Sequence, residues 1–291
     1  MSTLHVETSG PADGSVHSGV TVVMAHGWTL DSRTWVPVAD RLGRDVRVVR
    51  YDHRGHGRSA ACDPATMTID QLADDMADVI AAHAPDGPLV LAGHSMGGMT
   101  IMALAERHPA LVASRVAGVA LVATASGGLT GKAFGLGPDA LARVNAVEQR
   151  LYRSRRWSGR EHLSGVPALL GPGLRWLLLG EHPSREAVRL TTRTIADCRP
   201  STVSGFRPTL DAHERDAALA AFAAIPTAVL AGSRDRLTPL RLARRIHDGL
   251  PSAELTIFPG AGHMLPVERA AGTAERITAL VGAATRHTHA A

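Results

Sequence analysis

Short apolar runs alternate with helical patterns along most of the chain. The segments 68–80 and 99–108 are helical patterns, because their apolar side chains recur every three or four residues. The apolar runs contain few polar residues, which is typical of strands buried on both faces. In the first part of the chain they occupy residues 20–25, 46–51, 88–93 and 116–122. The alternation predicts an α/β fold, with a mostly parallel central sheet and helices on both of its faces.

The same alternation returns near the C-terminus. Residues 225–231 and 253–258 are two further apolar runs and are expected to be strands. A helix is expected between them, over 240–250, and another over about 271–283. Both strands can therefore join the sheet predicted from the first part of the chain.

One long insertion interrupts this pattern after Gly127 and Gly128. Residues 129–208 are helix-rich, contain many Gly and Pro residues, and show no clear strand. We therefore expect residues 1–128 and 209–291 to form the α/β core. The insertion is expected to form a helical cap that follows the strand near 116–123.

The charge balance does not indicate a nucleic-acid-binding protein. The 291 residues include 31 basic and 27 acidic side chains, a net charge of +4, and only 3% aromatic residues. Nucleic-acid binding needs basic residues clustered on one face, and single strands also need aromatic residues on which bases stack. We expect no nucleic-acid partner.

Cysteine usage and the N-terminus favour a cytoplasmic protein. Cys62 and Cys198 are too few for a disulfide framework or a cysteine-based zinc site. The first residues lack the basic and apolar regions of a signal peptide. No run approaches the roughly 20 apolar residues that span a bilayer, so no integral membrane segment is expected.

The sequence Gly-His-Ser-Met-Gly at 93–97 stands between a predicted strand and a predicted helix. A sharp strand-to-helix turn of this kind holds its middle residue, Ser95, in a strained backbone conformation at the carboxyl edge of the sheet. The N-terminus of the following helix favours negative charge at that point. Ser95 is therefore a candidate nucleophile.

A serine nucleophile needs a base that takes its proton and an acid that orients the base. Asp235 follows the strand at 225–231, and His263 follows the strand at 253–258, so both are expected at the edge where Ser95 lies. The loop after 116–122 contains no carboxylate that could compete with Asp235. The candidate catalytic residues are Ser95, Asp235 and His263, in the chain order expected on this fold.

Five motifs follow one another in a fixed order along the chain. They are His-Gly-Trp at 26–28, the stretch 51–59, the glycine-flanked serine motif at 93–98, Asp235, and Gly262-His263. Together they resemble the α/β-hydrolase superfamily, of the esterase, lipase and cofactor-free perhydrolase kind. The resemblance implies an oxyanion hole formed by the backbone N–H groups of Trp28 and Met96, with no cofactor and no metal ion. Dehalogenases and epoxide hydrolases of this superfamily carry Asp at the position of Ser95, which argues against those reactions.

The other histidines near these motifs have simpler interpretations. His53 and His56 lie in the turn after the second strand and are expected to be structural. His26 precedes the oxyanion loop and His94 precedes the nucleophile, so both are expected to orient backbone. His26, His94 and Asp52 could be metal ligands by type, but the motifs account for them without a metal.

Two features of the cap segment bear on the substrate. Residues 166–179 are strongly apolar, and they could line an acyl-chain pocket, contact lipid transiently, or pack the cap onto the core. A basic cluster could attract an anionic substrate or a membrane surface, or form a solvated helix face. The cluster consists of Arg143, Arg150, Arg153, Arg155, Arg156 and Arg160.

These features predict a serine hydrolase that cleaves a small-molecule carboxylic ester, with a moderately apolar acyl group, through an acyl-enzyme. The same residues are compatible with perhydrolase or haloperoxidase-type activity, and with thioester or lactone hydrolysis in a biosynthetic pathway. Hydrolysis of a C–C bond and a role as a ligand receptor without turnover are further alternatives. The sequence does not define the oligomeric state.

Overall fold

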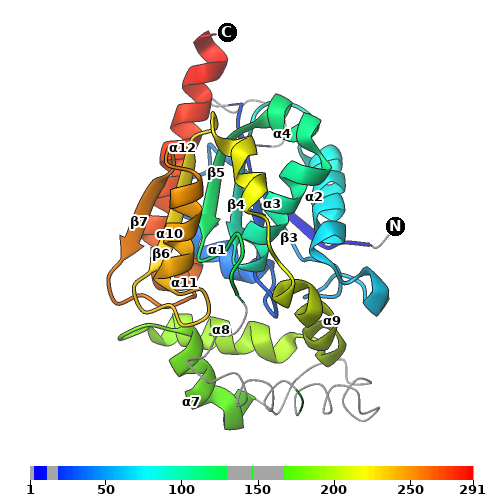
Figure 1. The fold of residues 1–291 in the computed structure, drawn as a ribbon, viewed down its shortest axis with the longest axis vertical. Helices are drawn as coiled ribbons and strands as arrows, with labels where there is room; N and C mark the ends of the chain where they lie inside the picture. Colours follow the sequence, from blue (N-terminus) through cyan, green and yellow to red (C-terminus); the bar gives the residue numbers. More distant parts are fainter. Residues whose placement is uncertain (1–2, 12–18, 130–145, 147–166, 291) are drawn as a thin grey trace.

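A seven-stranded sheet forms the centre of the protein (Figure 1). The computed structural model describes residues 3–11, 19–129, 146 and 167–290. The spatial order of the strands is β1-β3-β2-β4-β5-β6-β7, and every neighbouring pair is parallel except β1 and β3. The strands are β1 (Val6–Ser9), β2 (Thr21–Ala25), β3 (Arg47–Tyr51), β4 (Leu89–His94), β5 (Val116–Val122), β6 (Thr227–Gly232) and β7 (Glu254–Phe258).

The six strands predicted from the sequence are all present, and the fold is the mostly parallel α/β sheet that was expected. The prediction missed β1, an edge strand whose four residues, Val6–Ser9, include two exposed polar ones. Because an edge strand pairs on one side only and this one has four residues, its sequence lacks the apolar continuity of the central strands.

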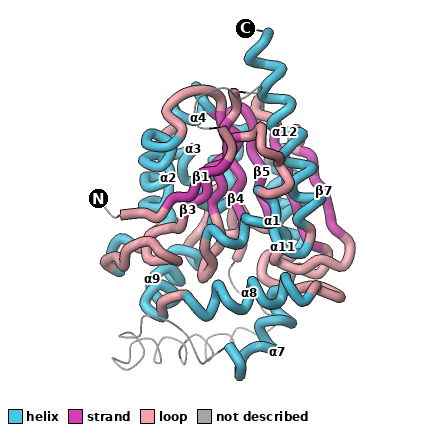
Figure 2. Tube along the Cα trace, turned by 180° about the vertical axis from the view of Figure 1, so that it is seen from behind, coloured by secondary structure: helices cyan, strands magenta, loops and turns pink. Residues whose placement is uncertain are grey.

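Helices cover both faces of the sheet, as Figures 1 and 2 show from opposite sides. One face packs against α2 (Ile69–His83), α3 (Met96–Arg107), α4 (Pro109–Arg115) and α10 (Leu240–Gly249). The other face packs against α1 (Val36–Ala39), α11 (Leu265–Glu268) and α12 (Ala270–Ala290). Successive strand residues serve opposite faces, since Val23 lies in the first core and Val22 and Met24 lie in the second.

Helix α2 illustrates how the sequence defines these elements. The hydroxyl of Thr68 accepts a hydrogen bond from the backbone N–H of Gln71 and caps the helix N-terminus. The apolar face predicted for this segment is buried: Leu72 and Met76 are both fully inaccessible to solvent. The helical pattern of 68–80 is therefore confirmed.

In the described part of the segment between β5 and β6, three α-helices lie at one end of the sheet (Figure 1). They are α7 (Pro167–Leu178), α8 (Arg185–Asp197) and α9 (Pro200–Asp211). The division into core and cap stays a prediction, and the boundary expected near 208 falls inside α9. The arginine cluster at 143–160 lies outside the described residues.

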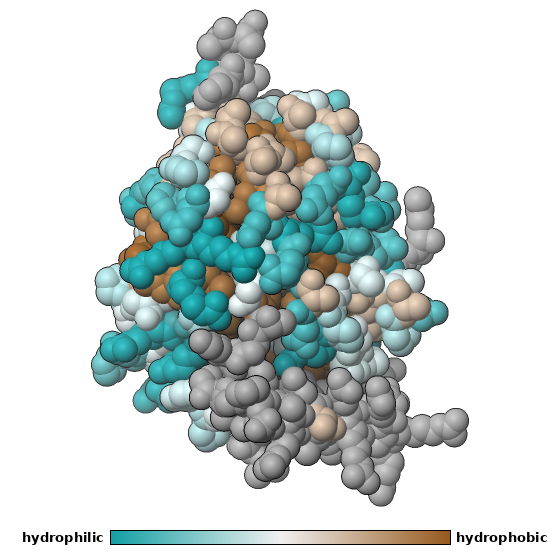
Figure 3. Space-filling model, viewed as in Figure 1, coloured by the Kyte–Doolittle hydropathy of each residue, from teal (hydrophilic) through white to brown (hydrophobic). Residues whose placement is uncertain are grey.

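The view in Figure 3 shows mostly hydrophilic side chains over the sheet and its helices, with smaller hydrophobic areas between them. Large hydrophobic side chains with substantial exposure are few in the described part of the chain. They are Trp176 on α7, which is 56% exposed, and Ile257 on β7, which is 38% exposed.

Candidate active site

Ser95 stands at the turn between β4 and α3. Its backbone has φ 52° and ψ −116°, a positive φ that is strained for a residue with a side chain. A Cβ atom on Gly93 would lie 2.5 Å from the carbonyl carbon of Gly97, and one on Gly97 would lie 2.2 Å from the carbonyl oxygen of Ala25. Glycine is therefore required at both flanking positions, because α3 starts in backbone contact with β4 and β2.

The backbone of Ser95 is held on both sides. Its N–H donates to the carbonyl of Val122 over 2.9 Å, and its carbonyl accepts the hydroxyl of Thr124 over 2.7 Å. Gly98 leaves room for this contact, because a Cβ there would lie 2.6 Å from the Thr124 side chain. The end of β5 thus supports the strained turn.

Asp235 and His263 meet in a buried hydrogen bond. Their loops follow β6 and β7, and Nδ1 of His263 lies 2.9 Å from Oδ2 of Asp235. The His263 side chain is 4% exposed and the Asp235 side chain is 0% exposed, so the pair is shielded from solvent. Because an ionised carboxylate only accepts hydrogen bonds, Nδ1 carries the hydrogen and Nε2 is left as the basic nitrogen.

The Asp235 carboxylate is fixed by its own loop. Oδ1 accepts the backbone N–H groups of Leu237 (2.9 Å) and Thr238 (2.8 Å), and Oδ2 accepts the hydroxyl of Thr238 (2.6 Å). The Thr238 oxygen also lies 3.2 Å from Nδ1 of His263. Sequence reasoning missed Thr238, although it follows Asp235 at the spacing of a local side-chain-to-backbone turn.

His94 brings the His263 loop to the nucleophile turn. It directly precedes Ser95, its Nε2 donates to the carbonyl oxygen of His263 over 2.9 Å, and the two rings lie 4.9 Å apart. No hydrogen bond between the Ser95 hydroxyl and His263 is recorded among the described residues. The structure therefore brings the two loops together without a direct bond between these side chains.

The loop with His26, Gly27 and Trp28 lies against Ser95, because a Cβ on Gly27 would be 3.2 Å from the Ser95 Cβ. Met96 is the first residue of α3, where a backbone N–H has no partner within the helix. Within the described ranges, the structure records no hydrogen-bond partner for the backbone N–H of Trp28 or Met96. These two N–H groups directly follow Gly27 and Ser95, the two residues that meet at this turn.

Three buried histidines support this loop. Nδ1 of His26 donates to the Gly27 carbonyl (2.8 Å), and its Nε2 accepts the N–H of His53 (2.9 Å). Nε2 of His56 accepts the N–H of Thr29 (3.3 Å), a residue with a positive φ of 65° directly after Trp28. Burial lowers the pKa of His26 and His53, and it lowers the pKa of His56 to about 3. Burial thus keeps these histidines neutral, and their hydrogen bonds orient backbone, which is the structural role that the sequence indicated.

The turn after β3 is anchored by two carboxylates. Asp52 accepts the backbone N–H groups of Ser32 (2.7 Å) and Arg58 (2.8 Å). Burial alone would raise the pKa of Asp52, but its hydrogen bonds with the backbone N–H groups of Arg58 and Ser32 lower it. Arg54 makes a bidentate, buried ion pair with Asp75 on α2, at 2.6 and 2.5 Å. Sequence reasoning did not identify this pair, which joins residues far apart in the chain.

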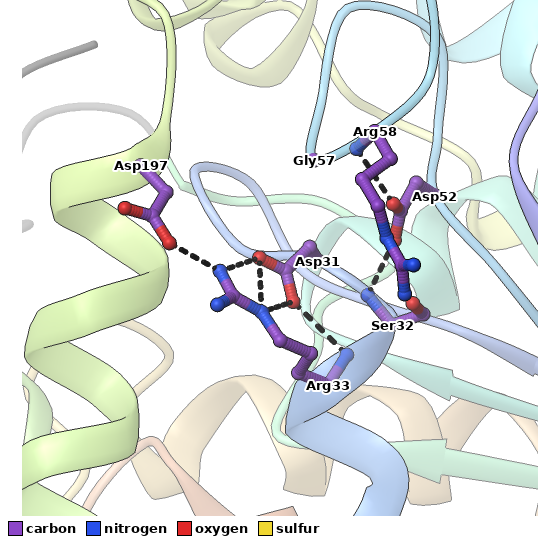
Figure 4. A pocket seen from close by; sticks show the side chains of 7 residues that line it. All are labelled: Asp31, Ser32, Arg33, Asp52, Gly57, Arg58 and Asp197. Atoms are coloured by element: carbon purple, nitrogen blue, oxygen red, sulfur yellow. Dashed lines mark hydrogen bonds and ion pairs between the residues drawn. The ribbon is translucent and has the colours of Figure 1, made fainter.

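A cavity of about 400 Å³ opens beside this turn (Figure 4). It is lined by Asp31, Ser32, Arg33, Asp52, Gly57, Arg58 and Asp197. None of the five candidate site residues lines it, and Arg33 ties Asp31 to Asp197 on α8 through ion pairs of 2.6 Å. The cavity is therefore distinct from the candidate active site.

No group of three His, Cys, Asp or Glu side chains in the described part of the chain is arranged to hold a metal ion. His26, His94 and Asp52, the metal ligands considered from the sequence, instead form the hydrogen bonds given above. None of the helices within the described ranges is long and apolar enough to cross a membrane.

The parallel sheet, the serine turn after β4 and the Asp–His pair after β6 and β7 define a hydrolase of the α/β type. The family described as "alpha/beta hydrolase fold" matches residues 20–270, and the chain belongs to this family. It is 33% identical over 265 residues to the pimeloyl-[acyl-carrier protein] methyl ester esterase of Chromobacterium violaceum, covering 89% of this chain and 91% of that protein.

Two further comparisons agree. A putative carbamate hydrolase RutD of Variovorax paradoxus is 31% identical over 275 residues, covering 92% of each chain. The solved structure of a thermophilic esterase from Thermogutta terrifontis superposes with a TM-score of 0.74 at 24% identity, covering 99% of this chain and 94% of that one. At this identity the likeness to the solved structure shows the fold alone.

Proposed function

We propose that the protein is a serine hydrolase that cleaves a carboxylic ester through an acyl-enzyme on Ser95. The observation that carries the proposal is the buried 2.9 Å hydrogen bond between Asp235 and His263, held beside the strained Ser95 turn through His94. Outside an active site, such a turn and a buried carboxylate–imidazole pair would both cost stability. Their coincidence supports an acyl-transfer site.

In this proposal the Ser95 hydroxyl oxygen attacks the ester carbonyl carbon while Nε2 of His263 takes its proton. Asp235 holds Nδ1 and stabilises the imidazolium that forms. The imidazolium then protonates the leaving alcohol, the C–O bond of the ester breaks, and the acyl group stays on Ser95. A water molecule, deprotonated by the same Nε2, releases the acid and restores the serine.

The negative oxygen of the tetrahedral intermediate would be held by the backbone N–H groups of Trp28 and Met96. Their lack of other recorded partners in the described structure supports this role. One such donor contributes about 3–4 kcal/mol of transition-state stabilisation in related chemistry. The N-terminus of α3 adds a favourable field at the same point.

An apolar cluster supports an acyl group of moderate hydrophobicity. Leu30, Leu237 and Met264, from the loops that carry the candidate site residues, pack together with Leu179 and Val203 from the segment between β5 and β6. The esterase relative acts, by its name, on a methyl ester of a pimeloyl group on an acyl-carrier protein, which agrees with cleavage of a carboxylic ester. Transient lipid contact through the cap and a cytoplasmic location remain predictions.

The test is a series of p-nitrophenyl esters from acetate to palmitate, assayed with the wild type, Ser95→Ala and the control Ser114→Ala. Ser114 is an exposed serine on α4. We expect activity that peaks at one chain length, survives in the control, and falls about 10³-fold or more in Ser95→Ala. Undiminished turnover by Ser95→Ala would overturn the proposal.

The carbamate-hydrolase relative makes carbamate cleavage the second candidate, because the same nucleophile and oxyanion donors can act on a carbamate carbonyl. If the ester series is inactive while Ser95 still reacts with a fluorophosphonate, carbamates are the next substrates to assay. Thioesters, lactones and peroxide-dependent halogenation follow. Activity on one of them would replace the ester in the proposal and keep the catalytic residues.

A further inference from the structure

Residues 176–181, which we call the strap, comprise the end of α7 and the three residues after it. The strap forms hydrogen bonds with the loops that carry Asp235 and His263. The backbone N–H of His263 donates to the Leu178 carbonyl over 2.8 Å. Arg236, next to Asp235, donates to the Trp176 carbonyl over 2.6 Å. The proposed catalytic base is therefore held by a backbone bond to a residue outside its own loop.

Glu268 joins the strap to both neighbours of His263. One carboxylate oxygen accepts the backbone N–H of Gly180 in the strap over 2.7 Å. The other accepts the N–H groups of Gly262 and Met264, each over 3.1 Å. Loss of the partner of a partly buried backbone N–H is costly, so the carboxylate fixes the strap and the backbone on both sides of His263 at once.

The strap and the His263 loop also touch backbone to backbone. A Cβ on Gly180 would lie 2.0 Å from the carbonyl oxygen of Gly260 and 2.5 Å from the N–H nitrogen of Gly262. A Cβ on Gly262 would lie 2.5 Å from the nitrogen of Gly180. With no side chain between them, a displacement of the strap moves the loop that carries His263.

We propose that Glu268 is a positioning residue, which locks the His263 loop onto the strap and so sets where Nε2 stands relative to Ser95. This inference rests on the proposed function, since it assigns a role in proton transfer at that site. When the base is displaced by a fraction of an ångström, the rate of proton transfer falls strongly, while the affinity for substrate changes little. The signature is therefore a loss in kcat with KM near the wild-type value.

The experiment compares Glu268→Gln and Gly180→Ala with two matched controls. The first variant keeps the side-chain shape but presents amide hydrogens to backbone donors, and the second pushes the strap away by its new Cβ. Glu181→Gln, on the same strap, changes an exposed ion pair with Arg234. Gly173→Ala adds a Cβ on α7, where nothing beyond the helix's own backbone lies within 4 Å among the described residues. The readouts are kcat, KM, fluorophosphonate labelling rate and unfolding temperature, with rates taken well below unfolding.

We expect both test variants to lose about tenfold to a hundredfold in kcat and in labelling rate, with the controls within about twofold of wild type. Wild-type rates in folded test variants would overturn the inference, even if their unfolding temperatures fall. Failure of both to fold would also overturn it, because the strap would then be needed for folding itself. A wild type that is never labelled would instead overturn the proposed function.

Discussion

Asp235 offers its carboxylate to four donors, and only one of them, Nδ1 of His263, belongs to the proposed reaction. The N–H groups of Leu237 and Thr238 and the hydroxyl of Thr238 fix the carboxylate within its loop, so that Oδ2 faces Nδ1 of His263. The loop thus fixes the acceptor without help from the histidine. A short sequence after β6 is therefore enough to orient His263, which lies on another loop.

Replacing this acceptor tests the role of Asp235 directly. In Asp235→Asn the amide can present hydrogens to Nδ1, which favours the tautomer with hydrogen on Nε2 and removes the base. We expect kcat to fall about 10⁴-fold with little change in fold. The control Asp211→Asn changes an exposed carboxylate that pairs with Arg207 on α9. Ester turnover and circular dichroism of both variants check this, and activity of Asp235→Asn near the control would contradict it.

At the scale of elements, the start of α3 depends on backbone contact with β2 and β4. The Gly97→Ala variant would place a Cβ 2.2 Å from the Ala25 carbonyl oxygen, which is backbone that cannot move aside cheaply. We expect the free energy of unfolding to fall by about 3 kcal/mol or more.

The same glycine-to-alanine change on another helix should instead raise the free energy of unfolding. Gly282 lies on α12, and a Cβ there would meet only the flexible end of Arg286 at 3.5 Å. Gly282→Ala should raise stability by about 0.5–1 kcal/mol, because alanine loses less conformational freedom in a helix. Urea unfolding of both variants measures the contrast, and equal effects would contradict the packing described for α3.

The sequence predicted those elements whose signal is local. Central strands were found because they are continuously apolar. Ser95, Asp235 and His263 were selected as candidates because each follows a strand in a characteristic loop, and their catalytic roles stay a prediction. The start of α3 was placed three residues late, at 99 rather than Met96, because glycines weaken the helical signal. Glu268, Thr124 and the Arg54–Asp75 pair act on residues distant in the chain or outside their own motif, so no local pattern could assign their partners.

For the whole molecule, several histidines are buried in the neutral state. Nε2 of His26 and of His56 each accept a backbone N–H, and protonation would place two hydrogens face to face. Burial lowers the pKa of His56 to about 3 and that of His213 to about 4. These side chains therefore take up protons on unfolding but not in the folded protein.

The folded protein should therefore lose stability when the pH is lowered. A histidine with a folded pKa below its unfolded value of about 6.5 contributes full stability above that pH and progressively less below it. As the pH falls from about 6.5 to about 4, each such histidine should lower the free energy of unfolding by about 1.4 kcal/mol for each pH unit. Urea unfolding from about pH 7.5 to pH 5 checks this. Stability that stays constant or rises on acidification in this range would contradict it.

The central claim is that Ser95 is the nucleophile, and adduct mapping tests it most directly. The wild type and the Ser114→Ala control are treated with a fluorophosphonate, digested, and their modified peptides identified by mass spectrometry. We predict one adduct per chain on the peptide that contains Ser95, formed in parallel with loss of ester turnover and absent in Ser95→Ala. An adduct on another residue, or turnover that continues after Ser95 is fully modified, would contradict the account.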